Sequence, residues 1–373
     1  MKPLRKFLLI LFFILFSGFL TLFLYHYFSP ERPKSLYSFG FIQLPNDFDI
    51  HFTKGSIAVS FPHTVFYSPE GIEIEPPFAA EDFINLPLGF SINKSTNNYL
   101  LINERYVFST RETPFKMVWQ SDDKIIKDIV EMEDFLLLVL EVPDNLLVPH
   151  IFNFDSKELT SLQGLVGSYF LDAAICDISD SFSILAFSDD GLFPSARVFH
   201  YNAKASLYGA LAKRDSLYFN IYRLQSSFVL VGTDRIICYN TDGSKNWALD
   251  IPNAYRHSKV FTEDYLWLYF YYSPTGFLNA LRISKDSSKE WFELPHGLSS
   301  LQSFSKGLIG VLNHEEIVVF DASGNLTAKF YPGIDIDKMY WDKDLPDNIY
   351  LLDRFDRLFA YTFFRPENKE ELQ

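Results

Sequence analysis

Residues 227–247, with the sequence SFVLVGTDRIICYNTDGSKNW, decide the fold. They contain two apolar runs of strand length, and Gly232 begins the short turn between these runs. The pair Asp242-Gly243 predicts a second turn, and a further strand with Trp247 follows it. The stretch therefore predicts three antiparallel strands joined by tight turns.

A second copy of this unit occupies residues 307–330, GLIGVLNHEEIVVFDASGNLTAKF. Gly324 follows Gly243 by 81 residues, and Asp321 takes the place of the polar residue that precedes the earlier turn. Between the copies lie two more apolar runs and Trp291, which follows Trp247 by 44 residues. Weaker strand, turn and strand patterns occur upstream, at residues 99–119, 134–155 and 183–201. The chain thus repeats a short β unit about every 40 to 45 residues.

A period of this length, with four short strands in each unit, is typical of an all-β ring called a β-propeller, whose sheets are called blades. Residues 38–364 have room for eight units, and seven units are the alternative. The last unit, residues 338–364, contains three evident strands. We therefore expect the segment from Ser38 to Leu44 to supply its outer strand and to close the ring.

The stretch 232–247 resembles the repeat of PQQ-like propellers, in which the pattern GT-x-GxLYALDA-x-TGKxxW ends each blade. The likeness covers one blade well and two others in part. Trp291 lacks the preceding Gly, and the copy at residues 307–330 has no Trp. This group of propellers includes quinoprotein dehydrogenases and a scaffold that assists outer-membrane protein assembly. The resemblance therefore implies the fold, together with either quinone chemistry or a scaffold function.

An uninterrupted apolar run from Phe7 to Tyr25 follows the cations Lys2, Arg5 and Lys6. As a helix, this run would span about 28 Å, close to the hydrocarbon thickness of a bilayer. The cations predict a cytoplasmic N-terminus, a single pass through the cell inner membrane and an extracytoplasmic remainder. A cleaved signal peptide is the alternative, although Phe and Leu fill the stretch where small residues would be needed for cleavage. We expect a cytoplasmic tail at 1–6, a transmembrane signal anchor at 7–28, a linker at 29–37, the propeller at 38–365 and a polar tail at 366–373.

The formal net charge of −14 argues against nucleic-acid binding, which depends on clustered Lys and Arg. The same charge disfavours docking on anionic lipid, so we expect the anchor alone to contact the membrane. Cys176 and Cys238 lie in apolar, strand-like segments and are interpreted as buried free thiols. A disulfide between them is chemically permitted outside the cytoplasm.

The sequence contains no motif for catalysis, a cofactor or a metal. A quinoprotein needs a calcium site and usually a vicinal cysteine pair, but the two cysteines are 62 residues apart. The eight histidines lack metal-ligand spacing and are interpreted as turn or surface residues. One acidic cluster lacks the Gly and Glu positions of a calcium loop and is interpreted as a solvated connection. Its members are Asp335, Asp337, Asp342, Asp344 and Asp347.

These observations favour a non-enzymatic, membrane-tethered scaffold or assembly factor that binds a protein partner. Aromatic residues in the blade connections are candidate contacts, and packing between blades is the favoured alternative for each of them: Tyr255, Phe193 and Tyr272. The alternative is a sensor or quinoprotein-like enzyme with a small ligand in the central channel. The candidate channel residues for that alternative are Arg223, Arg256, Asp177 and Lys338.

Overall fold

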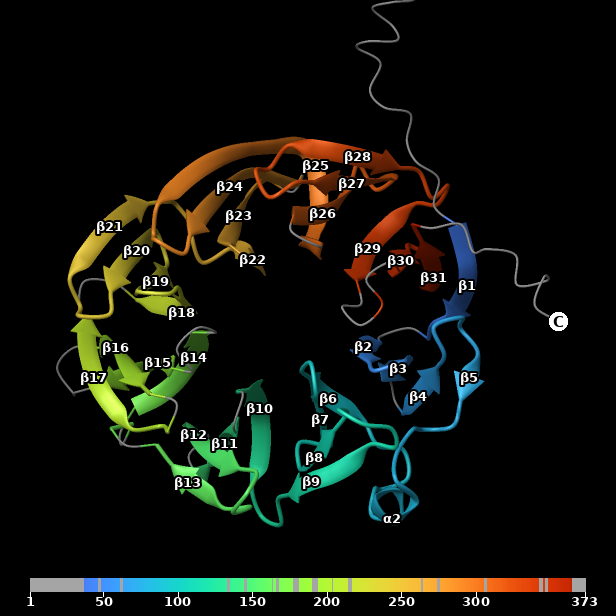
Figure 1. Cartoon of the computed structure of the whole chain (residues 1–373), viewed down its shortest axis with the longest axis horizontal. Helices are drawn as coiled ribbons and strands as arrows, with labels where there is room; N and C mark the ends of the chain where they lie inside the picture. Colours follow the sequence, from blue (N-terminus) through green and yellow to red (C-terminus); the bar gives the residue numbers. More distant parts are fainter. Residues whose placement is uncertain are drawn as a thin grey trace, which may run out of the picture.

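The computed structural model describes residues 37–363, with gaps at 46–47, 61–62, 133–134, 144–145, 163, 166–167, 177–180, 190–193, 203, 214–216, 263, 274–275, 305–306, 342–344 and 346–347. The described strands form six four-stranded antiparallel sheets and one seven-stranded sheet. In the larger sheet, the first half of β25 (Lys289–Phe304) pairs with β24, and its second half pairs with β26. This strand therefore belongs to two units, and the chain forms eight four-stranded blades around a central opening (Figure 1).

The blades are numbered in chain order, from the innermost strand of each outward. Blade 1 contains β2 (Asp49–Thr53), β3 (Ser56–Ser60), β4 (Thr64–Tyr67) and β5 (Glu73–Ile74). The short helix α2 (Ala80–Phe83) leads to blade 2, with β6 (Ile92–Ser95), β7 (Tyr99–Ile102), β8 (Tyr106–Ser109) and β9 (Lys116–Gln120). Blade 3 contains β10 (Ile125–Glu131), β11 (Phe135–Val142), β12 (Leu146–Asn153) and β13 (Leu159–Ser161). Blade 4 contains β14 (Ser168–Cys176), β15 (Ser181–Asp189), β16 (Pro194–Tyr201) and β17 (Leu207–Lys213).

The second half of the ring follows the same order. Blade 5 contains β18 (Tyr218–Arg223), β19 (Ser227–Gly232), β20 (Arg235–Asn240) and β21 (Lys245–Asp250). Blade 6 contains β22 (His257–Phe261), β23 (Tyr265–Ser273), β24 (Gly276–Ser284) and the first half of β25. Blade 7 contains the rest of β25, with β26 (Gly307–Leu312), β27 (Glu316–Phe320) and β28 (Leu326–Phe330). Blade 8 contains β29 (Ile336–Trp341), β30 (Asn348–Asp353), β31 (Arg357–Thr362) and β1 (Tyr37–Gln43).

The hydrophobic core is divided among the interfaces between blades. Strands such as β3, β7, β19 and β26 are buried along their whole length, because a neighbouring blade covers each face of the sheet. This explains why their sequences are continuously apolar instead of alternating. The described residues form eight buried clusters, one for each pair of adjacent blades. The clusters therefore agree with the count of eight blades.

The predicted closure of the ring is confirmed. Strand β1 pairs antiparallel with β31, and the amide of Leu44 donates to the carbonyl of Asp356 at 2.8 Å. Ile42 and Leu44 are buried in the cluster between blades 8 and 1. The N-terminal segment thus supplies the outer strand of the last blade, which joins the two ends of the described chain.

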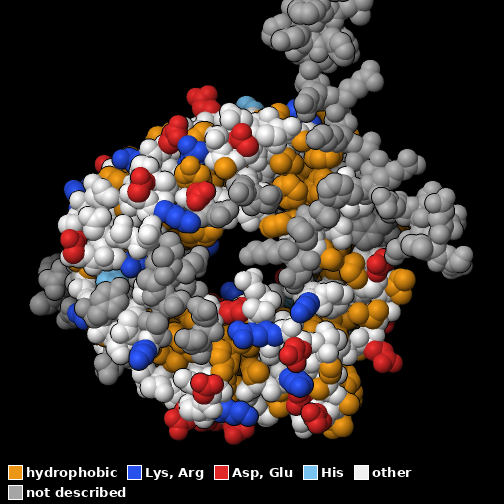
Figure 2. Space-filling view, in the orientation of Figure 1, with side chains coloured by type: hydrophobic (Ala, Val, Ile, Leu, Met, Phe, Trp, Pro, Cys, Tyr) orange, Lys and Arg blue, Asp and Glu red, His pale blue; other side chains and the backbone are white. Residues whose placement is uncertain are grey.

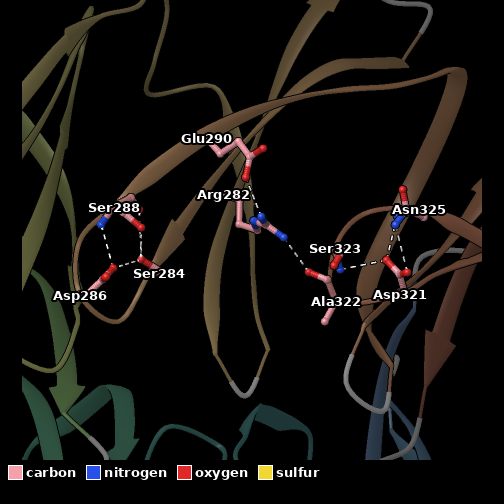
Figure 3. A network of polar contacts seen from close by, with 9 residues as sticks. All are labelled: Arg282, Ser284, Asp286, Ser288, Glu290, Asp321, Ala322, Ser323 and Asn325. Atoms are coloured by element: carbon pink, nitrogen blue, oxygen red, sulfur yellow. Dashed lines mark hydrogen bonds and ion pairs between the residues drawn. The ribbon is translucent and has the colours of Figure 1, made fainter.

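The predicted turn motif is structural. In blades 5 and 7 the turn before the outer strand contains Gly243 at φ +84° and Gly324 at φ +82°, a conformation that favours glycine. Asp242 accepts from the amide of Ser244, and this bonding lowers the pKa of the Asp242 carboxyl, chiefly through the Ser244 hydroxyl. Figure 3 shows Asp321 accepting from its own turn in the same way. Gly232 is the last residue of β19.

Side chains from one blade also bind the outer turn of the next blade. Arg282 on β24 donates to the carbonyl of Ala322 in blade 7 at 2.9 Å, and its other arm pairs with Glu290 at 2.6 Å (Figure 3). The indole Nε1 of Trp247 in blade 5 donates to the carbonyl of Ser287 in blade 6 at 2.8 Å. These bonds fix adjacent blades against each other at the outer rim.

We expect Trp247→Phe to lower the free energy of unfolding by about 1–2 kcal/mol, because it removes this hydrogen bond and part of the indole. Trp291, the related residue of blade 6, is 47% exposed. Trp291→Phe is therefore the matched control and should cost less than about 0.5 kcal/mol. Urea denaturation measures both values, and equal losses would contradict the assigned role of Trp247.

The predicted anchor at 7–28 and the tail at 366–373 lie outside the described residues, so both stay predictions. Among the described helices, none has the length and apolar composition needed to cross a membrane. Cys238 is a buried free thiol, as expected, and the side chain of Cys176 lies outside the description. The interpretation of all histidines as turn or surface residues is wrong for His200, which is 2% exposed between blades 4 and 5.

Candidate interaction surface

The innermost strands of five blades contain a β-bulge near their start, and each bulge leaves one residue without a cross-strand partner. Each of these strands is the innermost strand of its blade, so the extra residue lies on the edge of the sheet beside the central opening (Figure 1). Figure 2 shows the molecule hollowed at this centre. The five extra residues are all exposed: Asn93, Lys127, Leu171, Phe219 and Asp337.

At these equivalent positions, the residue is apolar in blades 4 and 5 and polar in blades 2, 3 and 8. Leu171 is 38% exposed and Phe219 is 42% exposed. Two residues before each bulge lie Tyr169, 44% exposed, and Leu217, 45% exposed. Tyr255 extends this set to the start of blade 6, since its ring centroid lies 6.4 Å from that of Phe219. We name these five residues the inner apolar surface.

A partly buried carboxylate bonds the two inner strands of this surface to each other. Asp172 on β14 accepts from the amide of Ile221 on β18 at 3.0 Å, and also from its own neighbour Ala173 at 2.9 Å. Burial raises the pKa of the Asp172 carboxyl, and the nearby Lys259 partly opposes this shift. The inner apolar surface is therefore carried by strands whose relative position is fixed.

Blade 6 is joined to this surface by a second polar contact. The hydroxyl of Tyr222 on β18 bonds to Nε2 of His257, whose Nδ1 donates to the carbonyl of Ala254 at 2.9 Å. This assignment makes Nε2 the acceptor and the tyrosine the donor. Burial lowers the pKa of the His257 ring, so the neutral form is favoured.

The predicted contact and channel residues are only partly brought together. Tyr255 is 39% exposed instead of packed between blades, and its hydroxyl accepts from Nε of Arg256 at 2.9 Å. Arg223 ends the inner strand of blade 5, whereas Lys338 is exposed on the inner strand of blade 8. Asp177, Phe193 and the side chain of Tyr272 lie outside the described residues.

The structure also contains a pocket of about 590 Å³ beside the turn between β24 and β25. Its charged groups are largely paired with one another: Arg282 with Glu290, and Lys285 with Asp264 at 3.8 Å. Within the described part of the chain, no three His, Cys, Asp or Glu side chains converge in a way that could hold a metal ion. Of the acidic cluster, the described Asp335 pairs with Arg354 at 3.1 Å.

No protein-family model and no curated protein matches the sequence. Among solved structures, BamB from Moraxella catarrhalis is similar at a TM-score of 0.49 and 9% identity, covering 89% of this chain and 99% of that one. The Neurospora crassa Pan2 WD40 domain is similar at a TM-score of 0.47 and 6% identity, covering 90% of this chain and 98% of that one. BBS1N, solved in complex with ARL6DN, is similar at a TM-score of 0.40 and 10% identity, covering 90% of this chain and 99% of that one. At these scores the likenesses carry no functional argument, so function is inferred from the chain's own residues.

Proposed function

We propose that this protein is a non-enzymatic, extracytoplasmic scaffold that binds a protein partner through the inner apolar surface. The observation that carries the proposal is the difference between equivalent positions of the ring. Leu171 and Phe219 occupy bulge positions that are Asn93, Lys127 and Asp337 in other blades. Exposed apolar side chains that gather on one arc of a rigid ring are typical of a protein-binding surface.

The same residues favour a protein partner over a small ligand. The surface extends across the starts of three innermost strands and consists of side chains that are each about 40% exposed. A small-molecule site is instead concave and covers most of its ligand. Aromatic side chains such as Phe219 and Tyr255 are enriched at the centres of protein interfaces, and Arg256 beside Tyr255 offers a polar rim.

The extracytoplasmic location in this proposal depends on the predicted anchor at residues 7–28. The anchor would hold the ring outside the cytoplasm by a short linker that ends at β1, the strand that closes blade 8. The PQQ-like resemblance supports an extracytoplasmic scaffold of this kind.

We expect Phe219→Asp to reduce the amount of captured partner at least tenfold when the full-length protein is crosslinked in membranes and purified. An aspartate in the centre of an apolar contact is desolvated without a counter-ion, which disfavours binding. Phe355→Asp is the matched control, because Phe355 is 58% exposed on blade 8, away from this surface. Both variants should melt like the wild type. Equal capture by both variants would contradict the proposal.

A further inference from the structure

Arg223, the last residue of β18, is a buried cation without a partner among the described residues. Arg223 is 7% exposed, and its Nε and Nη1 atoms are buried with no hydrogen-bond acceptor. None of the ion pairs among the described residues includes it. Removing a guanidinium from water is costly unless an anion or a hydrogen-bond acceptor compensates it. We therefore expect such a group beside Arg223.

Among the described residues, an aromatic ring and two polar side chains lie in the blade 4–blade 5 interface that contains Arg223. Its cross-strand partner Phe228 lies on the face of blade 5 that packs against blade 4, with its ring centroid 4.9 Å from that of His200. His200 Nδ1 lies 2.8 Å from the Ser183 hydroxyl. Burial, and secondarily the charge of Arg223, lower the pKa of His200 to about 4, so its ring is neutral at pH 7. Asp172 on the facing inner strand is committed to the amides of Ile221 and Ala173.

We propose that the blade 4–blade 5 interface beside Arg223 binds the oxyanion of a ligand, either a carboxylate or a phosphate. The planar guanidinium presents five donors that match both groups, and Ser183 and His200 contribute further polar atoms to the same interface. The site is separate from the inner apolar surface. Phe219 lies near the start of β18 and Arg223 at its end, so four residues of strand, about 13 Å, separate them.

The test compares melting temperatures of the full-length protein in detergent at pH 7 and constant ionic strength, with chloride replaced by inorganic phosphate or by acetate. We expect phosphate, acetate or both to raise the melting temperature of the wild type along a saturable curve. Arg223→Met should abolish this response. In chloride it should melt at or above the wild-type temperature, because methionine keeps an apolar stem and removes an uncompensated charge. The two anions distinguish a phosphate site from a carboxylate site.

Arg105→Met is the control, since Arg105 is an exposed arginine in the β7–β8 turn of blade 2, and its response to anions should equal that of the wild type. Three results would overturn the proposal. The first is a wild type that responds to neither anion. The second is an Arg223→Met variant that still responds. The third is an Arg223→Met variant that melts far below the wild type in chloride, which would mean that the chain itself neutralises the guanidinium. None of these results bears on capture of a partner by Phe219, so the two proposals can fail separately.

Discussion

Ile42→Asp is expected to open the ring and to lower the free energy of unfolding by more than about 4 kcal/mol. Ile42 is 5% exposed, and it packs in the cluster that joins blade 8 to blade 1, with Ile57, Val59 and Leu358. An aspartate there would be a buried charge without a counter-ion. Since β1 is the outer strand of the last blade, its release also exposes the edge of β31.

The adjacent residue provides the control. Phe41 lies on the same strand but is 56% exposed, and its ring stacks on Phe359 with centroids 6.1 Å apart. Phe41→Asp should cost less than about 1 kcal/mol, because it leaves the cluster intact. Urea denaturation followed by tryptophan fluorescence measures both variants. If Ile42→Asp unfolds at the wild-type urea concentration, β1 does not close the ring.

Acid should destabilise the fold through His200, by about 3 kcal/mol between pH 7 and pH 4. The pKa of this ring falls from 6.5 in the unfolded chain to about 4 in the folded protein, mainly because of burial and then because of Arg223. Between these two values the unfolded state binds more protons than the folded state. The contribution is therefore fully present above pH 6.5 and is lost as the pH falls toward 4.

His200→Gln is expected to remove most of this pH dependence, since glutamine can still bond to Ser183 but does not titrate. The measurement is the difference in unfolding free energy between pH 7 and pH 4.5 for each protein. Phe228→Leu controls for lost packing, because the Phe228 ring packs against the His200 ring and has no titratable group. It should lower stability by similar amounts at both pH values. An unchanged pH dependence in His200→Gln would show that the ring is not held neutral by its surroundings.

The architecture could be predicted because it follows from local sequence patterns, namely apolar runs of strand length and turn residues. A second strand covered on both faces by neighbouring blades is apolar throughout, as in 227–231. The outer turns of blades 5 and 7 contain a left-handed residue, which is why Gly243 and Gly324 recur there. The closure followed from the missing strand of the last unit. The blade 6–blade 7 connection was less visible, because β25 passes from one sheet to the next without a turn.

The inner apolar surface could not be predicted, because a bulge is a property of two paired strands. In the sequence, Leu171 and Phe219 are ordinary apolar residues of short strands, and only the register with β15 and β19 shows that they lack partners. The isolated cation Arg223 was singled out as a channel residue, but its burial against blade 4 depends on a neighbour from another part of the chain. A recurrent apolar residue at the start of adjacent units, Tyr169 and Leu217, is the signal that could have indicated the surface.

The most direct test of the scaffold account places a photocrosslinking residue at position 219 in the full-length protein, and in a second protein at position 337, the equivalent bulge in blade 8. Illumination in native membranes should yield a discrete protein adduct from position 219 and none from position 337. The adduct should disappear when Leu171→Asp is added to the first protein. The same adduct from both positions, or an adduct that survives Leu171→Asp, would contradict binding of a partner at the inner apolar surface.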